Sequence, residues 1–403
     1  MAARCHESLT GATIPLVVGW LSVAYLPAHE ECIPAEAARV TRPPLRVLHV
    51  ESGHEWRLTR DQVRLLVDGL RRTPHVQQTV ATLERSRLER AARDMGVPVI
   101  SLPWAVGTDP RALRTLARHI HRRWDVVHAH DTHALRLLAY LLALEGSQSG
   151  LVATRRAVLA PRSTWKWRRA HLVLAVSESA RDSLIAAGVE RMRIAVVPEG
   201  VDSSGLEIQT SGTLRKAAGA RGDDFIVASL AALGSDRDHA TLVRAASLVV
   251  KKYPNVRFTI FGEGPERGRL ENLIDTLDLG GWVCLPGYVA DARSSLSDID
   301  VFVMPSFQEE ISTGCLEAMW MGVPVVMTAT GGGRLRAEGI EPVCRGDHSG
   351  MAAAIGRLID DPDHRARAGE RASLYARAHR SEDMVRSTLD AYEAVSRAGL
   401  TSR

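Results

Sequence analysis

Apolar strand-like segments alternate with amphipathic helical segments along most of this chain, and the connections between them are short. Residues 45–53 (LRVLHVESG) and 125–131 (DVVHAHD) have the pattern of buried strands, and each is followed by apolar residues at helical spacing. The alternation restarts at residues 225–233 (FIVASLAAL), after a polar stretch at 202–222. This order is typical of right-handed β–α–β units, in which helices cover both faces of a parallel sheet.

The chain has 403 residues, which is enough for two domains with a core each. We therefore predict an α/β fold with two Rossmann-like domains, residues 44–205 and 206–380, that face each other across a cleft. Ligands of such sheets bind at the carboxyl ends of the strands. Residues 381–403 are predicted to form a C-terminal helix that packs back on the N-terminal domain.

Residues 1–43 lack this alternation and are predicted to be a leader or a disordered segment. Their apolar stretch at residues 14–26 is too short and too interrupted by proline for a membrane span. A weak signal-peptide core, a weak membrane anchor and a mis-assigned start codon remain alternatives for this segment.

The formal net charge is only +4, but it is unevenly distributed. Residues 1–200 hold 28 Lys and Arg against 19 Asp and Glu. A basic N-terminal half favours an anionic partner such as phosphate, an acidic glycan or a membrane surface, although abundant Arg on solvated helices explains it equally well. We predict no nucleic acid partner, because the basic residues are not interleaved with aromatic ones. The five cysteines form no C-x-x-C pair, which indicates reduced thiols in a cytosolic protein and no metal cluster.

The most specific chemistry lies in residues 305–326 (PSFQEEISTGCLEAMWMGVPVV). A buried strand leads to a loop with Glu309, a helix begins near the predicted N-cap Ser312, and Glu317 lies on its first turns. The helix start offers free N–H groups and a positive dipole end, which suit a phosphate. Two carboxylates can then bind sugar hydroxyls on either side of it. The alternative is that Glu309 and Glu310 are solvated surface charges.

This segment resembles the motif of the retaining GT-B glycosyltransferases of family 4, in which E-x7-E is followed by G-x-P-V-V. Here the pattern is Glu309, Glu317 and then residues 322–326. The resemblance implies that Glu309 is catalytic and contacts the transferred sugar, and that Glu317 binds the ribose. It also implies that Ser312 and Thr313 at the helix start bind the diphosphate. The C-terminal domain would be the nucleotide-sugar domain and the N-terminal domain the acceptor domain.

Two further segments resemble parts of the family's donor site. In the loop after residues 225–233, Arg237 stands where the family has Lys, and Ala232 stands where it has Arg. Arg237 can still bind phosphate through two hydrogen bonds, although a surface charge is the alternative. The turn at Gly262, Gly264 and Pro265 resembles the family's G-x-G-P turn, so Gly264 is a predicted donor contact.

The N-terminal half resembles enzymes that build lipopolysaccharide core or similar envelope glycans. In HVESGHEWR the predicted substrate contacts are Gly53, Trp56 and Arg57, but Leu58 and Thr59 replace the family's two glycines. In the next site segment, strand alternation places His128 and His130 on one face and Asp131 at the strand end. We predict a catalytic role for His130 and substrate contacts for the residues Asp131 and Arg156.

The resemblance implies a retaining glycosyltransferase of the hexosyltransferase type, acting in polysaccharide or lipopolysaccharide biosynthesis. Its donor would be a UDP- or GDP-linked sugar and its acceptor a glycan or a lipid-linked molecule, with no cofactor and no metal required. The expected location is cytoplasmic, with peripheral contact at the inner face of the cell membrane. The rival functions are a nucleotide-sugar epimerase of the same architecture and a non-catalytic nucleotide-sugar-binding protein, which Ala232 and the Leu58–Thr59 pair would explain.

Overall fold

The computed structural model describes most of the chain beyond residue 42, and residues 43–403 cluster as one compact unit. The described residues are 43–52, 59–104, 109–121, 124–145, 149–157, 159–161, 163–204, 206, 212–289, 292–306, 311–329 and 339–401. The predicted leader therefore lies outside them. Among these residues, no helix has both the length and the apolar character needed to cross a bilayer.

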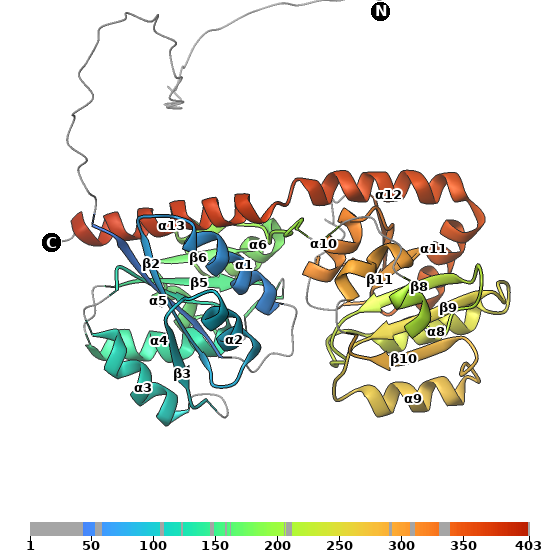
Figure 1. Ribbon diagram of the computed structural model, residues 1–403, viewed down its shortest axis with the longest axis horizontal. Helices are drawn as coiled ribbons and strands as arrows, with labels where there is room; N and C mark the ends of the chain where they lie inside the picture. The colour runs from blue at the N-terminus through green and yellow to red at the C-terminus, as the bar shows by residue number, and fades with distance from the viewer. Residues whose placement is uncertain are drawn as a thin grey trace, which may run out of the picture. The chain divides into compact units, whose positions relative to one another are not determined.

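The first half of the chain forms a seven-stranded sheet with the order β3-β2-β1-β4-β5-β6-β7, and its strand pairs are parallel. The strands are β1 Leu45–Glu51, β2 Val76–Leu83, β3 Val99–Leu102, β4 Val126–Ala129, β5 Gly150–Arg155, β6 Leu172–Ala175 and β7 Ile194–Val196. The helices between them are α1 Thr59–Arg71, α2 Arg87–Asp94, α3 Pro110–Ile120, α4 Thr132–Glu145, α5 Trp165–Arg169, α6 Glu178–Ala186 and the short η1 Arg191–Arg193. Figure 1 shows this half in blue to green.

The second half forms a six-stranded parallel sheet with the order β10-β9-β8-β11-β12-β13. Its strands are β8 Phe225–Leu230, β9 Val256–Phe261, β10 Val283–Gly287, β11 Val301–Met304, β12 Val325–Thr328 and β13 Ile340–Val343. Its helices are α7 Thr213–Ala217, α8 His239–Val249, α9 Arg267–Thr276, η2 Ala292–Asp298, α10 Thr313–Trp320, α11 His348–Asp360 and α12 Pro362–Arg377. The alternation in the sequence thus predicted the order of strands and helices in both sheets.

In each sheet the order in which successive strands are added reverses at one point. The predicted motifs lie just after the strands on either side of that point. In the first sheet the change lies between β1 and β4, which carry LRVLHVE and the start of DVVHAHD. In the second sheet it lies between β8 and β11, which lead to the loops of Arg237 and Ser312. Ligands of open α/β sheets bind at such switch points, beyond the carboxyl ends of the strands.

Apolar side chains cover both faces of each sheet. On one face of the first sheet, residues such as Leu48 and Val127 join the core formed with α3, α4 and α6. On the other face, Val47 and Val126 pack with α1 and with the last helix, α13 Ser381–Thr401. The strand residues therefore alternate between two buried faces, which explains why the strands are apolar throughout.

The last helix belongs with the first sheet, although it follows α12 of the second half (Figure 1). Tyr392 of α13 is fully buried, and Val395 packs against Gly150 at the start of β5. The two passages of the chain between the halves run side by side, because Val201 N–H donates to His379 O at 2.7 Å and Ser381 N–H donates to Val201 O at 3.0 Å.

The strand that ends the first half is short. Residues 194–202 close this half of the chain, and β7 covers only Ile194–Val196 of them. Pro198 has no N–H to donate to a neighbouring strand. A Cβ on Gly200 would lie 2.6 Å from the Cα of Ser381. The backbone at Gly200 therefore packs directly against the start of α13. The polar stretch that follows also contains the short helix α7, which the sequence pattern did not indicate.

The contact between Gly150 and α13 yields a first prediction. A Cβ at position 150 would lie 2.1 Å from Cγ1 of Val395, so Gly150→Ala should lower the free energy of unfolding by about 1–3 kcal/mol. Val395→Ala removes the obstructing methyl groups. Urea denaturation of both single variants and the double variant should therefore give a favourable coupling energy of about 1 kcal/mol or more. Strictly additive losses would show that α13 does not press on this strand.

Candidate active site

The candidate donor site begins with the loops that follow β8 and β9, which lie against each other. Leu233 N–H donates to Glu263 O at 3.0 Å, and Glu266 N–H donates to Leu233 O at 3.0 Å. A Cβ on Gly264 would lie 2.4 Å from Leu233 O, so this position tolerates only glycine without a shift of backbone. Gly262 has φ +142 and an equally close approach to Ala231 O, at 2.0 Å. These glycines thus fix the shape of the loop that carries Arg237.

Arg237 is buried at 7% exposure, at the end of that loop. Its Nε lies 3.7 Å from the Asp236 carboxylate, and its N–H donates to Gly234 O at 3.1 Å. His239 begins α8 two residues later and is also buried. A buried guanidinium at the carboxyl end of β8 is suited to an anionic group. It is not the solvated surface charge that the sequence left as an alternative.

The helix after β11 starts as predicted. Ser312 is the N-cap of α10, and its hydroxyl accepts from the Cys315 N–H at 3.2 Å. All eight residues of α10 are buried, including Glu317 at 8% exposure. The helix end therefore presents backbone donors in a largely desolvated setting, where their attraction for an anion is stronger than in water.

Glu317 has an ionic partner that the sequence did not reveal. Arg293 of η2 places its Nε 2.6 Å from Glu317 Oε1 and its Nη1 3.7 Å from Asp202 Oδ2. Arg293 also donates to the backbone carbonyl of Asp202. The buried carboxylate is thereby compensated, since an unpaired charge at this depth would be costly. No motif in the sequence marked this arginine.

Thr313 connects the donor side to the first sheet. Its hydroxyl accepts from Gln62 Nε2 at 3.2 Å and donates to Glu199 Oε2 at 3.3 Å. Gln62 also bonds both backbone groups of Gly200, at 2.7 and 2.9 Å. Glu199 in turn accepts from Arg156 Nε at 2.7 Å. The sequence reasoning missed Gln62 and Glu199, which are polar residues within otherwise ordinary helix and loop patterns.

In the first sheet, Asp131 serves the fold through both carboxylate oxygens. Oδ1 accepts from the N–H groups of His133 and Ala134 at 2.7 and 2.9 Å, which caps the start of α4. Oδ2 accepts from the Ser52 N–H at 2.7 Å and ties β1 to β4. These bonds account for an aspartate at this position, and its substrate contact stays a prediction.

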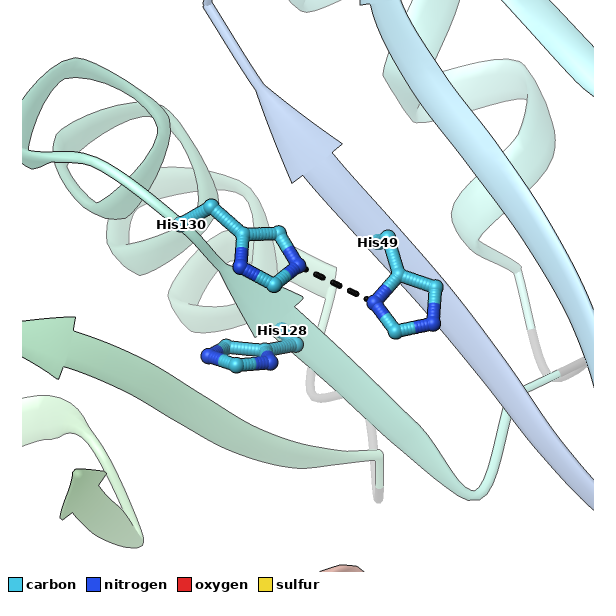
Figure 2. A group of neighbouring side chains, drawn as sticks. All are labelled: His49, His128 and His130. Atoms are coloured by element: carbon cyan, nitrogen blue, oxygen red, sulfur yellow. Dashed lines mark hydrogen bonds between the residues drawn. The ribbon is translucent and has the colours of Figure 1, made fainter. Parts of the chain in front are cut away.

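Three buried histidines lie together at the carboxyl ends of β1 and β4 (Figure 2). His128 and His130 share a side, as alternation predicted, with ring centroids 3.9 Å apart. The register pairs His49 with His128, and His49 Nδ1 lies 3.0 Å from His130 Nε2. Sequence reasoning passed over His49, although its place in the first strand could have indicated it. The two nitrogens of His128 bond Tyr392 OH at 2.5 Å and Thr154 Oγ1 at 2.7 Å.

A small cavity of about 30 Å³ adjoins this cluster, which is room for about one water molecule. Its polar lining consists of Gln62, His128, His130, Thr154, Arg156, Glu199 and Thr388. Arg156 Nη1 donates to His130 O at 2.7 Å and so fixes the backbone of that histidine. Arg156 therefore lies beside His130, whereas its neighbour Arg155 packs its guanidinium 5.3 Å from the Trp167 ring.

The same histidines could also hold a metal ion. One ring nitrogen from each lies within 4.8 Å of the others, and imidazole is a common ligand of zinc and other transition metals. Among the described residues, these three histidines are the one group of side chains placed closely enough to bind a metal ion together. The described cysteines Cys284, Cys315 and Cys344 are free thiols. The absence of a metal requirement stays a prediction.

Burial keeps these imidazoles neutral. Desolvation lowers the pKa of His49 to about 4, partly offset by a hydrogen bond with Gln78. Desolvation also lowers the pKa of His128 and His130 well below the usual value, with a further contribution from the charge of Arg156. In the second sheet, burial and the charge of Arg237 lower the pKa of His239 to about 3.

Four predicted site residues lie outside the described residues: Glu309, Gly53, Trp56 and Arg57. Of the others, Arg237, Gly264, Ser312, Thr313 and Glu317 lie on loops and helix starts after β8, β9 and β11. His130, Asp131 and Arg156 lie after β4 and β5. The hydrogen bonds of Gln62, Glu199 and Thr313 join these two sets.

Two family models match the chain, one in each half. The model described as glycosyl transferases group 1 matches residues 225–361. The model described as glycosyltransferase family 4 matches residues 61–204. Together they span more than half of the 403 residues.

Curated relatives are also similar in sequence. The chain is 33% identical over 191 residues to the lipopolysaccharide core biosynthesis glycosyltransferase LpsD of Rhizobium meliloti, covering 45% of this chain and 52% of that relative. It is 27% identical over 298 residues to the alpha-D-kanosaminyltransferase of Streptomyces kanamyceticus, covering 68% of this chain and 76% of that relative. The match thus spans about half the length of LpsD.

Solved structures confirm the predicted fold class. HepE from Anabaena, in complex with UDP-glucose, matches with a TM-score of 0.74 and 19% identity over 86% of this chain and 100% of its own. Sucrose-phosphate synthase from Thermosynechococcus elongatus matches with a TM-score of 0.70 and 17% identity over 88% of this chain and 100% of its own. At these identities the likeness shows the two-domain α/β architecture.

The neutral histidines predict a stability that falls in mild acid. The folded-state pKa of His49 and His239 lies below the ordinary 6.5, so their contribution is complete above pH 6.5 and is lost as the pH falls. Between about pH 7.5 and about pH 5.5, each should remove about 1.4 kcal/mol from the free energy of unfolding. Urea denaturation at both pH values measures this loss.

The matched variants separate these groups from other titrations. His239→Gln should reduce the acid-induced loss by about 1.4 kcal/mol. His119→Gln, at an exposed position on α3, should leave the loss unchanged. Equal losses in both variants would contradict a neutral His239 in the folded protein.

Proposed function

Because the chain belongs to the group 1 glycosyltransferases of family 4, as its motifs predicted, we propose that it is a retaining glycosyltransferase. One observation carries the proposal. The capped, buried start of α10 follows β11 next to the Arg237 loop after β8, with Glu317 buried on the same helix. This arrangement joins donors for a diphosphate to a carboxylate for hydroxyl groups.

The donor is proposed to be a nucleoside diphosphate sugar. Its diphosphate would lie against the start of α10 at Ser312 and Thr313, with Arg237 and the Gly264 turn beside it. Glu317 would bind the ribose hydroxyls, and Glu309 would orient the transferred sugar. HepE, whose structure contains UDP-glucose, supports a UDP-linked hexose, and a GDP-linked sugar is the other member of the proposed class.

Retention would follow from attack on the same face that the leaving group vacates. The bond between the anomeric carbon and the phosphate oxygen breaks, and the nucleoside diphosphate leaves with the electron pair. The acceptor oxygen bonds to that carbon, and its proton passes to the leaving phosphate. Backbone donors and Arg237 would stabilise the charge that develops on the diphosphate, so the step requires no metal and no other cofactor.

The acceptor is proposed to enter from the first half of the chain, past Gly53, Trp56 and Arg57 and along His130, Asp131 and Arg156. The small cavity beside His130 has the size of one hydroxyl group or water. The relationship to LpsD supports a glycan or lipid-linked acceptor in lipopolysaccharide or other envelope polysaccharide biosynthesis.

The two carboxylates are expected to have separable effects. Glu309→Ala should lower turnover of UDP-glucose by about a hundredfold or more, because a contact made to the reacting sugar is lost, while UDP binding stays near wild type. Glu317→Ala should weaken UDP binding by about tenfold or more, because a charged hydrogen-bonding group is lost. Calorimetry with UDP and the release of UDP from UDP-glucose measure the two effects, and GDP-mannose replaces the donor if UDP does not bind.

Two carboxylates provide matched controls. Glu310→Ala, next to Glu309, should leave turnover unchanged. Glu341→Ala breaks another ion pair of the second sheet, with Arg357 at 2.9 Å, and should leave UDP affinity unchanged. Full turnover in Glu309→Ala, or undiminished UDP affinity in Glu317→Ala, would refute the respective role. Conversion of the donor sugar to an epimer without any acceptor would favour the epimerase instead.

A peripheral membrane contact is proposed for one face of the first half. Tyr140 and Leu144 of α4 are 47% and 81% exposed, and the Tyr140 ring lies 4.7 Å from the Trp165 ring of α5. Arg168 and Arg169 of α5 are exposed as well. We call these five residues the α4–α5 patch. Aromatic and basic residues together are suited to the interface of an anionic membrane on the cytoplasmic side.

Vesicle sedimentation tests the α4–α5 patch. The protein should pellet with phosphatidylglycerol vesicles at low salt and be released at high salt, because screening weakens the attraction of the basic side chains. Tyr140→Ser combined with Leu144→Ser should reduce binding by about tenfold, since apolar area no longer enters the interface. Leu374→Ser, at a position 70% exposed on α12 of the second half, serves as the control. Absence of wild-type binding at low salt would remove the proposal.

A further inference from the structure

The histidine cluster is organised as two separate hydrogen-bonded arrangements. His128 is held by Tyr392 on one side and Thr154 on the other, so both of its nitrogens have partners. His49 and His130 instead bond each other, through Nδ1 of His49 and Nε2 of His130 (Figure 2). A neutral imidazole has one donor and one acceptor nitrogen, so one of these two rings donates and the other accepts. The direction of this bond decides which nitrogen of His130 carries its proton.

The direction is determined further from the site, by Gln78 of β2. Its amide Nε2 donates to Val67 O of α1 at 2.7 Å, which fixes the orientation of the amide group. A flipped amide would direct the oxygen at the carbonyl of Val67, which is an unfavourable contact between two acceptors. Gln78 Oε1 is therefore available as an acceptor, and it is buried on the same face of the sheet as His49.

His49 Nε2 is the matching donor. This nitrogen and Gln78 Oε1 are both buried on the same face of two neighbouring strands, and neither has a hydrogen-bond partner in the described part of the structure. Burial lowers the pKa of His49, and the nearby Gln78 amide raises it in part, which is the effect of an acceptor close to an imidazole N–H. If His49 Nε2 were unprotonated, two buried acceptor atoms on the same face would both lack a donor, which is unfavourable.

We propose that Gln78 and His49 act as positioning residues that hold His130 in the tautomer protonated on Nε2. The chain of bonds runs from Val67 O through the Gln78 amide to His49 Nε2–H, and His49 Nδ1 then accepts from His130 Nε2–H. The Nδ1 of His130 keeps a lone pair, and no described residue donates to it. This inference rests on the proposed function only in assigning that lone pair to an acceptor hydroxyl.

We assign this lone pair to the small cavity that His130 lines, which has the size of one hydroxyl group. His130 lines the small cavity with Arg156 and Glu199, and Arg156 fixes its backbone carbonyl at 2.7 Å. In the opposite tautomer, Nδ1 would carry hydrogen and could only donate to the acceptor oxygen. With a lone pair at Nδ1, His130 accepts a hydrogen bond from the acceptor hydroxyl and so orients it toward the anomeric carbon, before the proton passes to the leaving phosphate.

The arrangement also accounts for the three nearby imidazoles without an ion. The nitrogens of His128 and the facing pair of His49 and His130 are all engaged in hydrogen bonds. A metal ion would have to break these bonds to collect three ligands. Bound metal is therefore an outcome that the experiment must be able to detect.

Nitrogen-15 NMR of histidine-labelled protein tests the tautomer directly. The signals of His130 are assigned by their loss in His130→Gln. Wild-type His130 should show the pattern of an Nε2–H tautomer. Gln78→Met removes the amide at nearly constant volume and should give a mixture of tautomers at His130. Gln78→Glu, as a buried neutral carboxylic acid, can donate its O–H to Val67 O and accept from His49 Nε2–H through its carbonyl oxygen, so it should preserve the wild-type pattern. Gln77→Met, on the exposed face of β2, is the matched control.

Kinetics provides the second measurement. Gln78→Met should lower kcat by about tenfold or more while the KM for the nucleotide sugar stays unchanged, because His130 is misdirected but the donor site is intact. Gln78→Glu should recover most of that loss, and a purely structural role would not predict such recovery. If the wild-type protein shows no transfer at all, the proposed function fails, whereas the NMR pattern still decides the tautomer.

Several outcomes would overturn the inference. An Nδ1–H pattern for wild-type His130 would reverse the direction of the chain, and this spectrum requires no variant to fold. An unchanged His130 pattern in folded Gln78→Met would show that Gln78 does not control the tautomer. A stoichiometric metal ion in the purified protein, lost in His49→Gln, would assign the same nitrogens to metal binding.

Discussion

The parallel pairing of β1 with β4 is the constraint on which the polar edge of the first sheet depends. Because both strands run the same way, their carboxyl ends bring Ser52, His130 and Asp131 to one edge of the sheet. The register pairs His49 with His128 and sets two imidazoles side by side under α13. In the second sheet, β8 and β11 are also parallel neighbours, so the Arg237 loop and the start of α10 lie at the same edge. Two switch points therefore produce the polar edges of an otherwise apolar fold.

The charged groups at these edges are tolerated because they have partners. Asp131 accepts three backbone N–H bonds, Glu317 is compensated by Arg293, and Glu199 is compensated by Arg156. The histidines remain neutral, which avoids the cost of burying charge. A site built in this way is rigid before substrate arrives, and rigidity of this kind keeps reacting groups in a fixed geometry.

Sequence reasoning predicted the elements and the local motifs well, because both depend on short-range patterns. Apolar runs marked the strands, and Ser312 was recognised as an N-cap from its place before a helical segment. The partners of these residues were missed, since they come from distant parts of the chain. Arg293 meets Glu317, Gln78 meets His49, and Tyr392 meets His128 across a separation of 264 residues. Single polar residues in amphipathic helices carry no pattern that identifies such contacts.

The two chain passages at Val201 and His379–Ser381 have a mechanical consequence. A single linker between two bodies can bend, twist and stretch independently. Here two strands of backbone lie next to each other and are tied by N–H···O bonds and by the close approach of Gly200 to Ser381. Such a paired tether resists twisting and lateral sliding, because either motion would shear the bonds between its strands. Rotation of the two halves about a single hinge axis is then the displacement that the tether opposes least.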